Sequence, residues 1–188
     1  MLQLSNYKKV NLFILLGVYI AMLIYFMFFG FGRPELTEIR EYRYWLIPDS
    51  IPLWLPKQFS IDIIKLWIFA LGNLLAFIPF GILVPMLFKK HIHTYFKFFV
   101  LFVFFILCME ILQMVTYLGS FDINDIMVNT MGATIGFFSY RASERMNTSR
   151  KAFVSMGLSI FIFILLMFSI AWAYNHTITP YLKHTFGI

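Results

Sequence analysis

The chain has 188 residues, of which 61% are hydrophobic and only 13% are charged, and its mean hydropathy is +0.80. A soluble domain carries a charge on roughly a quarter of its residues. These values therefore exclude a water-soluble globular domain and predict a polytopic membrane protein.

Five stretches of the chain are long and apolar enough to cross a bilayer, whose core requires roughly 20 apolar residues. We expect helices near 10–29, 66–88, 98–118, 121–140 and 152–174. The third and fourth contain acids, but we interpret both as helices because lipid leaves an exposed irregular backbone without hydrogen-bond partners. The predicted fold class is all-α, with five transmembrane helices and residues 1–188 as a single domain.

The first apolar run follows Lys8 and Lys9 and could also be a signal peptide. Its length and the lack of a clear small-x-small cleavage site favour a retained helix. Residues 30–65, which follow it, contain five basic and five acidic residues. Prolines 48, 52 and 56 exclude a regular helix there, and tryptophans 45, 54 and 67 are typical of the headgroup layer. We expect an external segment along the membrane surface.

Basic residues mark one side of the membrane. Nine of them lie before the first helix and in the turns after the second and fourth helices, with Glu144 as the one acid in those turns: Lys8, Lys9, Lys89, Lys90, Lys97, Arg141, Arg145, Arg150 and Lys151. The positive-inside rule then places the N-terminus in the cytoplasm and the C-terminus outside. The same bias accounts for the net charge of +6, so we expect no nucleic-acid partner.

Polar residues inside the predicted helices converge at one depth. At about 1.5 Å per residue, Glu110 lies about 12 Å and Asn73 about 10 Å from the outer ends of their helices. Asp122 and Asp125 lie in the first turns of the fourth helix. We therefore expect one outward-facing site, formed by Asn73, Glu110, Gln113, Asp122, Asp125 and Asn129.

Simpler structural roles exist for most of these side chains. The three amides could be hydrogen-bond partners between helices, each worth about 0.6–2 kcal/mol: Asn73, Gln113 and Asn129. Asp122 could be a helix N-cap. A charged side chain inside a membrane helix costs about 2.5–3.5 kcal/mol, so Asp125 and above all Glu110 are the hardest to explain without a function.

Proline and glycine predict the packing around this site. Pro79 lies in mid-helix below Asn73 and is expected to kink that helix. Gly132 and Gly136 form a GxxxG pair, which lets a neighbouring helix approach closely. We interpret both glycines as packing residues.

Three stretches, "LGNLLAFIPFG", "EILQ" and "FDINDIMVNTMGATIGF", resemble the VanZ-like family of bacterial membrane proteins, named for a teicoplanin-resistance protein. "YRYWLIP" is similar to the family's arginine-containing segment. The resemblance implies that the marked positions are Arg43, Asn73, Pro79, Gly81, Glu110, Gln113, Asp122, Asp125, Asn129 and Gly132. It also implies a role in glycopeptide resistance or envelope physiology, without a settled reaction.

The chain departs from the family pattern at one place. Family members commonly carry an arginine two or three residues before the first aspartate, and here the sequence reads "TYLGSFD". If that arginine normally neutralises the acids, either Arg43 or Lys65 serves instead here or the site works differently.

Three functions fit these observations. In an enzyme or transfer protein acting on a lipid-linked or headgroup substrate, Glu110 would be a general acid or base, and Asp122 and Asp125 its partner base or metal ligands. Arg43 would hold a phosphate or carboxylate, and the three amides would contact the substrate. The alternatives are a proton- or cation-coupled transporter, which the absence of a repeat disfavours, and a binding or structural protein without turnover. The expected partners are membrane lipids or a lipid-linked envelope precursor, in the bacterial cytoplasmic membrane.

Overall fold

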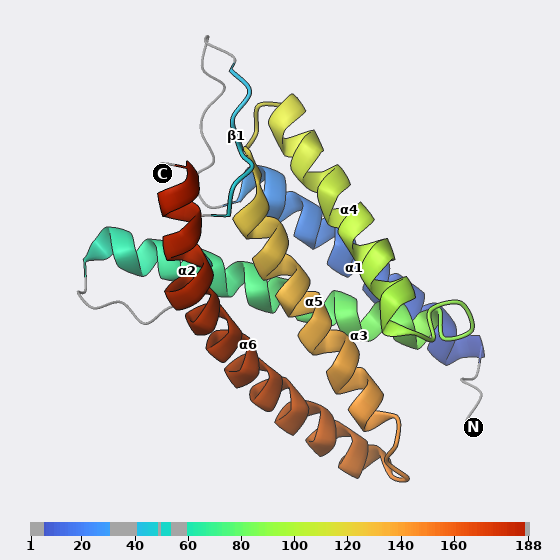
Figure 1. Ribbon diagram of the computed structural model, residues 1–188. Coiled ribbons are helices and arrows are strands. Elements are labelled where there is room, and N and C mark those ends of the chain that lie inside the picture. The colour runs from blue at the N-terminus through green and yellow to red at the C-terminus, as the bar shows by residue number, and fades with distance from the viewer. Residues whose placement is uncertain (1–5, 31–40, 49, 54–59, 187–188) are drawn as a thin grey trace.

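The computed structural model describes residues 6–30, 41–48, 50–53 and 60–186, and these are mostly helical (Figure 1). The helices are α1 (Asn6–Phe29), α2 (Ile61–Ala76), α3 (Ile78–Leu87), α4 (Tyr95–Val115), α5 (Ile123–Ser143) and α6 (Ser149–Phe186). Two short strands, β1 (Tyr44–Trp45) and β2 (Phe121–Asp122), complete the described elements. The predicted all-α fold class is confirmed.

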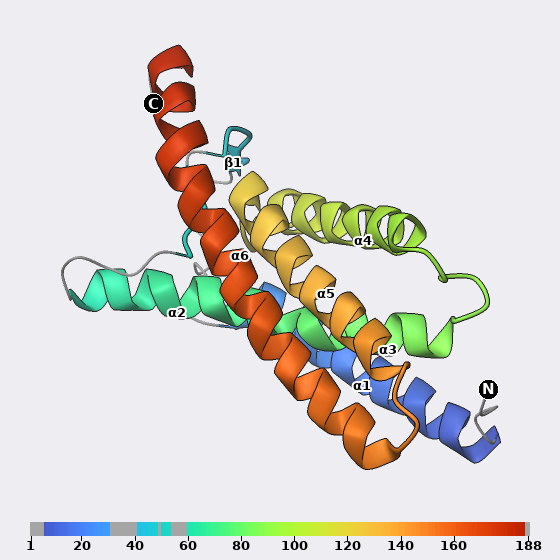
Figure 2. The same cartoon turned by 60° about the horizontal axis from the view of Figure 1, so that its bottom comes forward.

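Four helical stretches are long and apolar enough to cross a membrane: α1, the stretch 64–87 formed by α2 and α3, α4, and α6. The fifth predicted span corresponds to α5, which has 21 residues and is about 31 Å long at 1.5 Å per residue. Helix α5 packs against α2, α3, α4 and α6 and lies between α4 and α6 (Figure 2). Because its neighbours cover it, α5 can be the most polar of the long helices.

The predicted helix 66–88 is two helices, and the first begins earlier, at Ile61. The break is at Phe77, whose φ of −94° and ψ of −3° end the regular turn. Pro79 explains it, because proline lacks the N–H of an α-helical bond and clashes with the preceding turn. The Tyr19 hydroxyl of α1 donates a 2.6 Å hydrogen bond to the Ala76 carbonyl beside the break. A neighbouring helix thus supplies a hydrogen-bond donor to the backbone where the helix is interrupted.

Other helix ends also differ from the predicted ones. Helix α4 begins at Tyr95, after the N-cap Thr94, and ends at Val115 rather than 118. Helix α5 begins after its cap at Asp122 and extends to Ser143 rather than 140. Helix α6 spans 149–186 rather than 152–174 and includes Pro180. The apolar run marks the part suited to hydrocarbon, whereas the helix continues beyond it.

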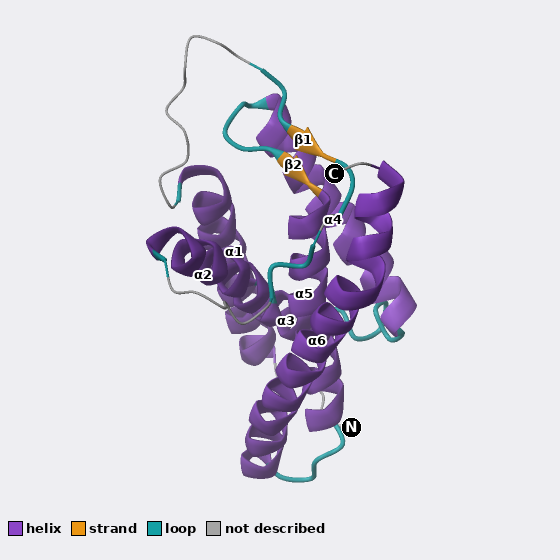
Figure 3. Cartoon of the chain, turned by 60° about the vertical axis from the view of Figure 1, so that its left-hand side comes forward, coloured by secondary structure: helices purple, strands orange, loops and turns teal. Residues whose placement is uncertain are grey.

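The segment between α1 and α2 contacts the start of α5, which the sequence did not predict. In the parallel pair β1–β2, Tyr44 pairs with Phe121 and Trp45 with Asp122 (Figure 3). The rings of Tyr42 and Tyr117 stack at 5.2 Å beside it. Part of the predicted external segment 30–65 is thus tied to the polar end of α5. Trp54 and Pro56 lie outside the described residues.

The turns rich in basic residues lie together at the opposite end. Phe13 of α1 contacts Phe88 edge-to-face at 5.8 Å. Lys89 and Arg141 both pair with Glu144, which joins the α3–α4 turn to the end of α5. The start of α1 and both turns share this end, and the C-terminus lies at the other (Figures 1 and 2). This arrangement agrees with the positive-inside pattern, while the orientation in the membrane stays a prediction.

Candidate functional site

The polar residues predicted for the site gather around the first turn of α5. Asp122 is the N-cap of α5, and its Oδ1 accepts a 2.8 Å hydrogen bond from the backbone N–H of Asn124. Asp125 lies in the same first turn. Negative charge is favourable there, because the unpaired N–H groups and the dipole make a helix N-terminus positive. Asp122 therefore does act as a helix N-cap, the structural role considered for it from the sequence.

Asn73 and Asp125 are in direct contact although they are 52 residues apart. The Asn73 Nδ2 donates a 3.0 Å hydrogen bond to the Asp125 Oδ1. Both side chains are half-buried. The bond joins α2 to the start of α5 and holds one oxygen of the Asp125 carboxylate in a fixed position.

Glu110 reaches the same turn from α4. It is only 1% exposed, and its Oε2 accepts a 3.2 Å hydrogen bond from the backbone N–H of Asp122. A bond between a charged acceptor and a neutral donor is stronger than one between neutral groups, and the helix terminus adds a favourable field. Asn73, Glu110, Asp122 and Asp125 are thus brought together from three helices.

Gln113 and Asn129 are also buried, each 2% exposed, but their contacts are different. The Gln113 Nε2 donates a 2.7 Å hydrogen bond to the Met27 carbonyl, one of the last carbonyls of α1, which lack a partner within their own helix. The Asn129 Oδ1, one turn deeper in α5, has no hydrogen-bond partner among the described residues. Gln113 therefore ties α4 to α1, and Asn129 keeps an unused acceptor.

The two cations considered as neutralising partners lie outside this cluster. Arg43 is exposed, and it is its backbone carbonyl that accepts a 2.9 Å bond from the N–H of Phe121. Lys65 is exposed as well. In the part of the chain that the structure describes, neither side chain forms an ion pair with a carboxylate.

The described residues contain no group of three or more His, Cys, Asp or Glu side chains placed to hold a metal ion. Asp122 and Asp125, for which a metal-ligand role was expected, therefore belong to no such group.

The VanZ/LLP1 family model matches residues 12–147. The chain belongs to the VanZ/LLP1 family. The match covers most of α1, all of α2 to α5 and every residue predicted for the site, so the resemblance seen in the sequence motifs is confirmed. Comparison with curated proteins and with solved structures gives no match.

Three glycines bring the backbones of this VanZ/LLP1 chain into contact below the cluster. A Cβ added to Gly132 would overlap the Leu74 carbonyl oxygen, and one added to Gly136 would overlap that of Ile78. A Cβ on Gly81 would overlap the carbonyl oxygen of Ala133. Small residues permit such close helix contacts in membranes. Because Leu74 follows Asn73, this contact sets the distance at which Asn73 meets α5.

A polar clamp on α6 was missed from the sequence. The Asn175 Oδ1 accepts a 2.8 Å bond from the Ile51 N–H, and its Nδ2 donates a 2.8 Å bond to the Ile51 carbonyl. The Tyr174 hydroxyl donates to the Pro48 carbonyl at 3.0 Å. Ile51 and Leu53 are 2% and 1% exposed and pack in one cluster with residues of α2, α5 and α6. The available sequence signal for this contact was the pair of apolar residues Ile51 and Leu53 on either side of Pro52.

Proposed function

We propose that this VanZ/LLP1 protein acts in the bacterial cytoplasmic membrane, where its carboxylates at the start of α5 bind or act on a lipid-linked or headgroup substrate in the outer leaflet. The proposed outcome is reduced sensitivity to glycopeptides such as teicoplanin. The observation that carries this proposal is the Asn73–Asp125 hydrogen bond, which fixes a half-buried carboxylate beside the buried Glu110.

Carboxylates accept hydrogen bonds, so the part of the substrate at Asp125 would carry hydroxyl, amide or ammonium groups. Arg43 lies one residue before β1, which pairs with β2 at the start of α5. A phosphate or carboxylate of the same substrate would be held on this exposed side, by the guanidinium of Arg43. Glu110, buried behind Asp122, would act as the proton donor or acceptor.

Binding without turnover is the second candidate, and one observation favours it. Asp122 caps α5, Glu110 accepts a bond from the Asp122 backbone, and Asp125 accepts one from Asn73, so all three carboxylates have partners that stabilise the fold. In that case the carboxylate cluster would bind a ligand, or stabilise the part of α5 inside the membrane, without catalysing a reaction.

Glu110→Gln tests whether charge at Glu110 is needed. The glutamine oxygen can still accept the bond from Asp122, so shape is kept and only the charge and the titrating proton are lost. We expect the variant to have the teicoplanin sensitivity of a strain lacking the protein, at unchanged protein abundance and thermal stability. Asp125→Asn should act in the same way, since its amide oxygen can still accept from Asn73.

Gly132→Leu is the packing control. It should lower abundance and resistance together, because a side chain there separates α2 from α5. Glu110→Gln and Asp125→Asn proteins that are abundant and fully active would show that the carboxylates are structural.

A further inference from the structure

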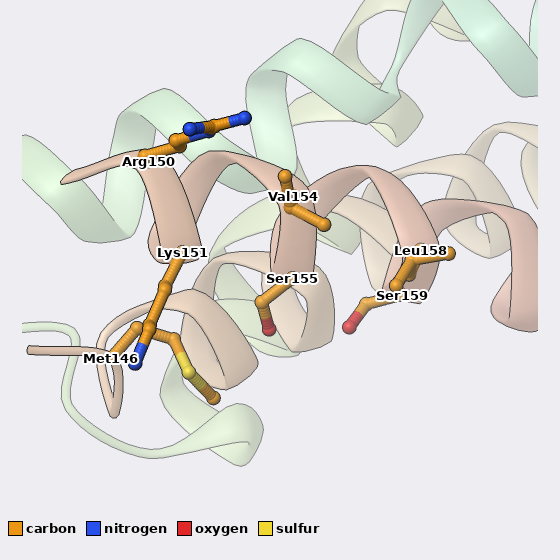
Figure 4. Close-up of a pocket in the computed structure, with 7 residues that line it drawn as sticks. All are labelled: Met146, Arg150, Lys151, Val154, Ser155, Leu158 and Ser159. Atoms are coloured by element: carbon orange, nitrogen blue, oxygen red, sulfur yellow. The ribbon is translucent and has the colours of Figure 1, made fainter. Parts of the chain in front are cut away.

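A groove lies on the first turns of α6 (Figure 4). The start of α6 is at the end of the molecule opposite the start of α5, where the carboxylates lie (Figure 1). Its volume is about 570 Å³. Two rows of side chains spaced four residues apart line it along α6. One row is Arg150, Val154 and Leu158, and the other is Lys151, Ser155 and Ser159, with Met146 of the preceding turn beside them.

Two cationic side chains, Arg150 and Lys151, line the end of the groove at the start of α6, which we call its mouth. Arg150 and Lys151 are both exposed, and neither forms an ion pair within the described part of the chain. Lys89 and Arg141, at the same end, are different because both pair with Glu144. The mouth of the groove therefore carries positive charge that no carboxylate among the described residues neutralises.

Two serine hydroxyls follow further along the helix. Ser155 and Ser159 are half-buried and lie about 6 Å and about 12 Å beyond Lys151 at 1.5 Å per residue. Neither hydroxyl has a hydrogen-bond partner among the described residues. By contrast, Ser169 and Thr177 of the same helix donate to carbonyls four residues earlier, at 3.0 Å and 2.7 Å. The groove thus holds two available donors.

The rest of the groove is apolar. Val154 and Leu158 are 52% and 59% exposed, on a helix whose apolar stretch is only 6% buried within the protein. Such a surface is stable against hydrocarbon but not against water. The cationic side chains come first along α6, and beyond them the hydroxyls of one row lie beside the apolar side chains of the other. A phospholipid also presents its charged phosphate at one end, followed by ester oxygens and an apolar acyl chain.

We propose that this groove binds one anionic phospholipid. Its phosphate binds Lys151 at the start of the serine row, its ester oxygens accept from Ser155, and its acyl chain follows Val154 and Leu158. Arg150, whose side chain projects from another side of α6 (Figure 4), adds to the attraction of the anionic headgroup. Inorganic phosphate would use only the mouth, because it has no part that could cover the apolar rows. A zwitterionic lipid would leave the excess charge of the mouth uncompensated.

The test uses the full chain in detergent and measures binding of long-chain phosphatidylglycerol by native mass spectrometry. Phosphatidylcholine with the same acyl chains and inorganic phosphate are the comparison probes. Each basic residue near a membrane surface adds to the attraction of an anionic lipid. We therefore expect Arg150→Gln with Lys151→Gln to weaken phosphatidylglycerol binding at least roughly tenfold.

The matched control is Lys8→Gln with Lys9→Gln, an exposed pair that also lies in the first turn of an apolar helix at this end. It removes the same charge but should leave affinity within about twofold, which separates the groove from general attraction. Ser155→Ala with Ser159→Ala preserves the helix, because alanine is the best helix former. It should weaken binding roughly threefold or more by removing the donors.

The proposal would be overturned if Lys8→Gln with Lys9→Gln lost as much affinity for phosphatidylglycerol as Arg150→Gln with Lys151→Gln. Unchanged binding in the serine variant would also overturn it. So would phosphatidylcholine binding as tightly as phosphatidylglycerol. Full displacement of the lipid by inorganic phosphate would show that the groove holds only an anion.

Discussion

At the scale of single residues, burial changes the roles that the acids can take. From sequence, Glu110 was the strongest functional candidate, because a charge in mid-helix is costly. In the fold it is 1% exposed and accepts from the N-terminus of α5, which lowers that cost. Asp125 is half-buried and held by Asn73. A substrate arriving from the surface would therefore meet Asp125 first, with Glu110 behind it.

Glu144, at the other end of α5, gives a prediction for pH. Burial raises the pKa of Glu144, but hydrogen bonds from Lys89, Arg141 and Tyr140 outweigh it and hold the pKa below the ordinary 4.5. A carboxyl whose pKa is lowered in the folded state stabilises that state above its unfolded pKa and loses this contribution as pH falls through the lowered value.

The thermal midpoint of the protein in detergent should therefore fall on acidification below about 4.5. Glu144→Gln should have a lower midpoint at neutral pH and a smaller decrease on acidification. If the thermal midpoints of the two proteins changed with pH in the same way, the ion pairs of Glu144 with Lys89 and Arg141 would have no role in stability.

At the scale of elements, α5 and its glycines organise the membrane core. Gly132 and Gly136 face the backbone of α2 and α3, and the resulting contact places Asn73 opposite Asp125. Such packing is sensitive to single atoms, because an added methyl group in a tight interface forces the backbones apart.

Gly132→Ala should thus destabilise the protein by about 1–3 kcal/mol. Gly72→Ala in α2 and Gly157→Ala in α6 are matched controls, since a Cβ at either position meets no atom within 4 Å. Alanine favours a helix over glycine by about 1 kcal/mol, so both controls should be neutral or slightly stabilising. Thermal unfolding in detergent measures the difference, and equal effects at all three glycines would refute the close contact.

The clamp between α6 and the Ile51 loop gives a second test at this scale. Asn175→Ala leaves the N–H of the buried Ile51 unpaired, at a cost of about 1–3 kcal/mol, whereas the Ile51 carbonyl still accepts a 2.8 Å bond from the N–H of Leu53. Thr177→Ala removes only a bond within α6 and is the control. We expect a lower thermal midpoint and faster proteolysis of the 48–53 loop for Asn175→Ala. A loop that is cleaved equally in both variants would argue against the clamp.

For the whole molecule, sequence reasoning succeeded where local chemistry decides the structure. Apolar runs located the spans, Pro79 indicated the break, and the GxxxG pattern indicated the close helix contact. It failed where partners are distant in sequence, as for Asn175 with Ile51, or where the partner is backbone, as for Glu110 with Asp122. Backbone groups are present at every position, so no residue pattern identifies which one a side chain will contact.

Membrane orientation is the last prediction, and the leaflet of both proposed sites depends on it. Replacing Cys108, the one cysteine, by alanine gives a background for single-cysteine labelling. Ser120→Cys lies in the turn between α4 and β2, next to the carboxylates. Asn147→Cys is exposed in the α5–α6 turn, next to the groove. Because basic residues favour the cytoplasmic side, an impermeant thiol reagent should label residue 120 in intact cells.

Residue 147 should label only after lysis. Both variants must retain wild-type abundance, and labelling after lysis shows that each thiol is accessible. The reverse pattern would place the carboxylates in the inner leaflet, where an extracellular glycopeptide does not reach, and the basic groove in the outer one. Since the two turns lie at opposite ends of one helix, α5, they must exchange sides together. A single pair of labels thus decides which leaflet each site can serve.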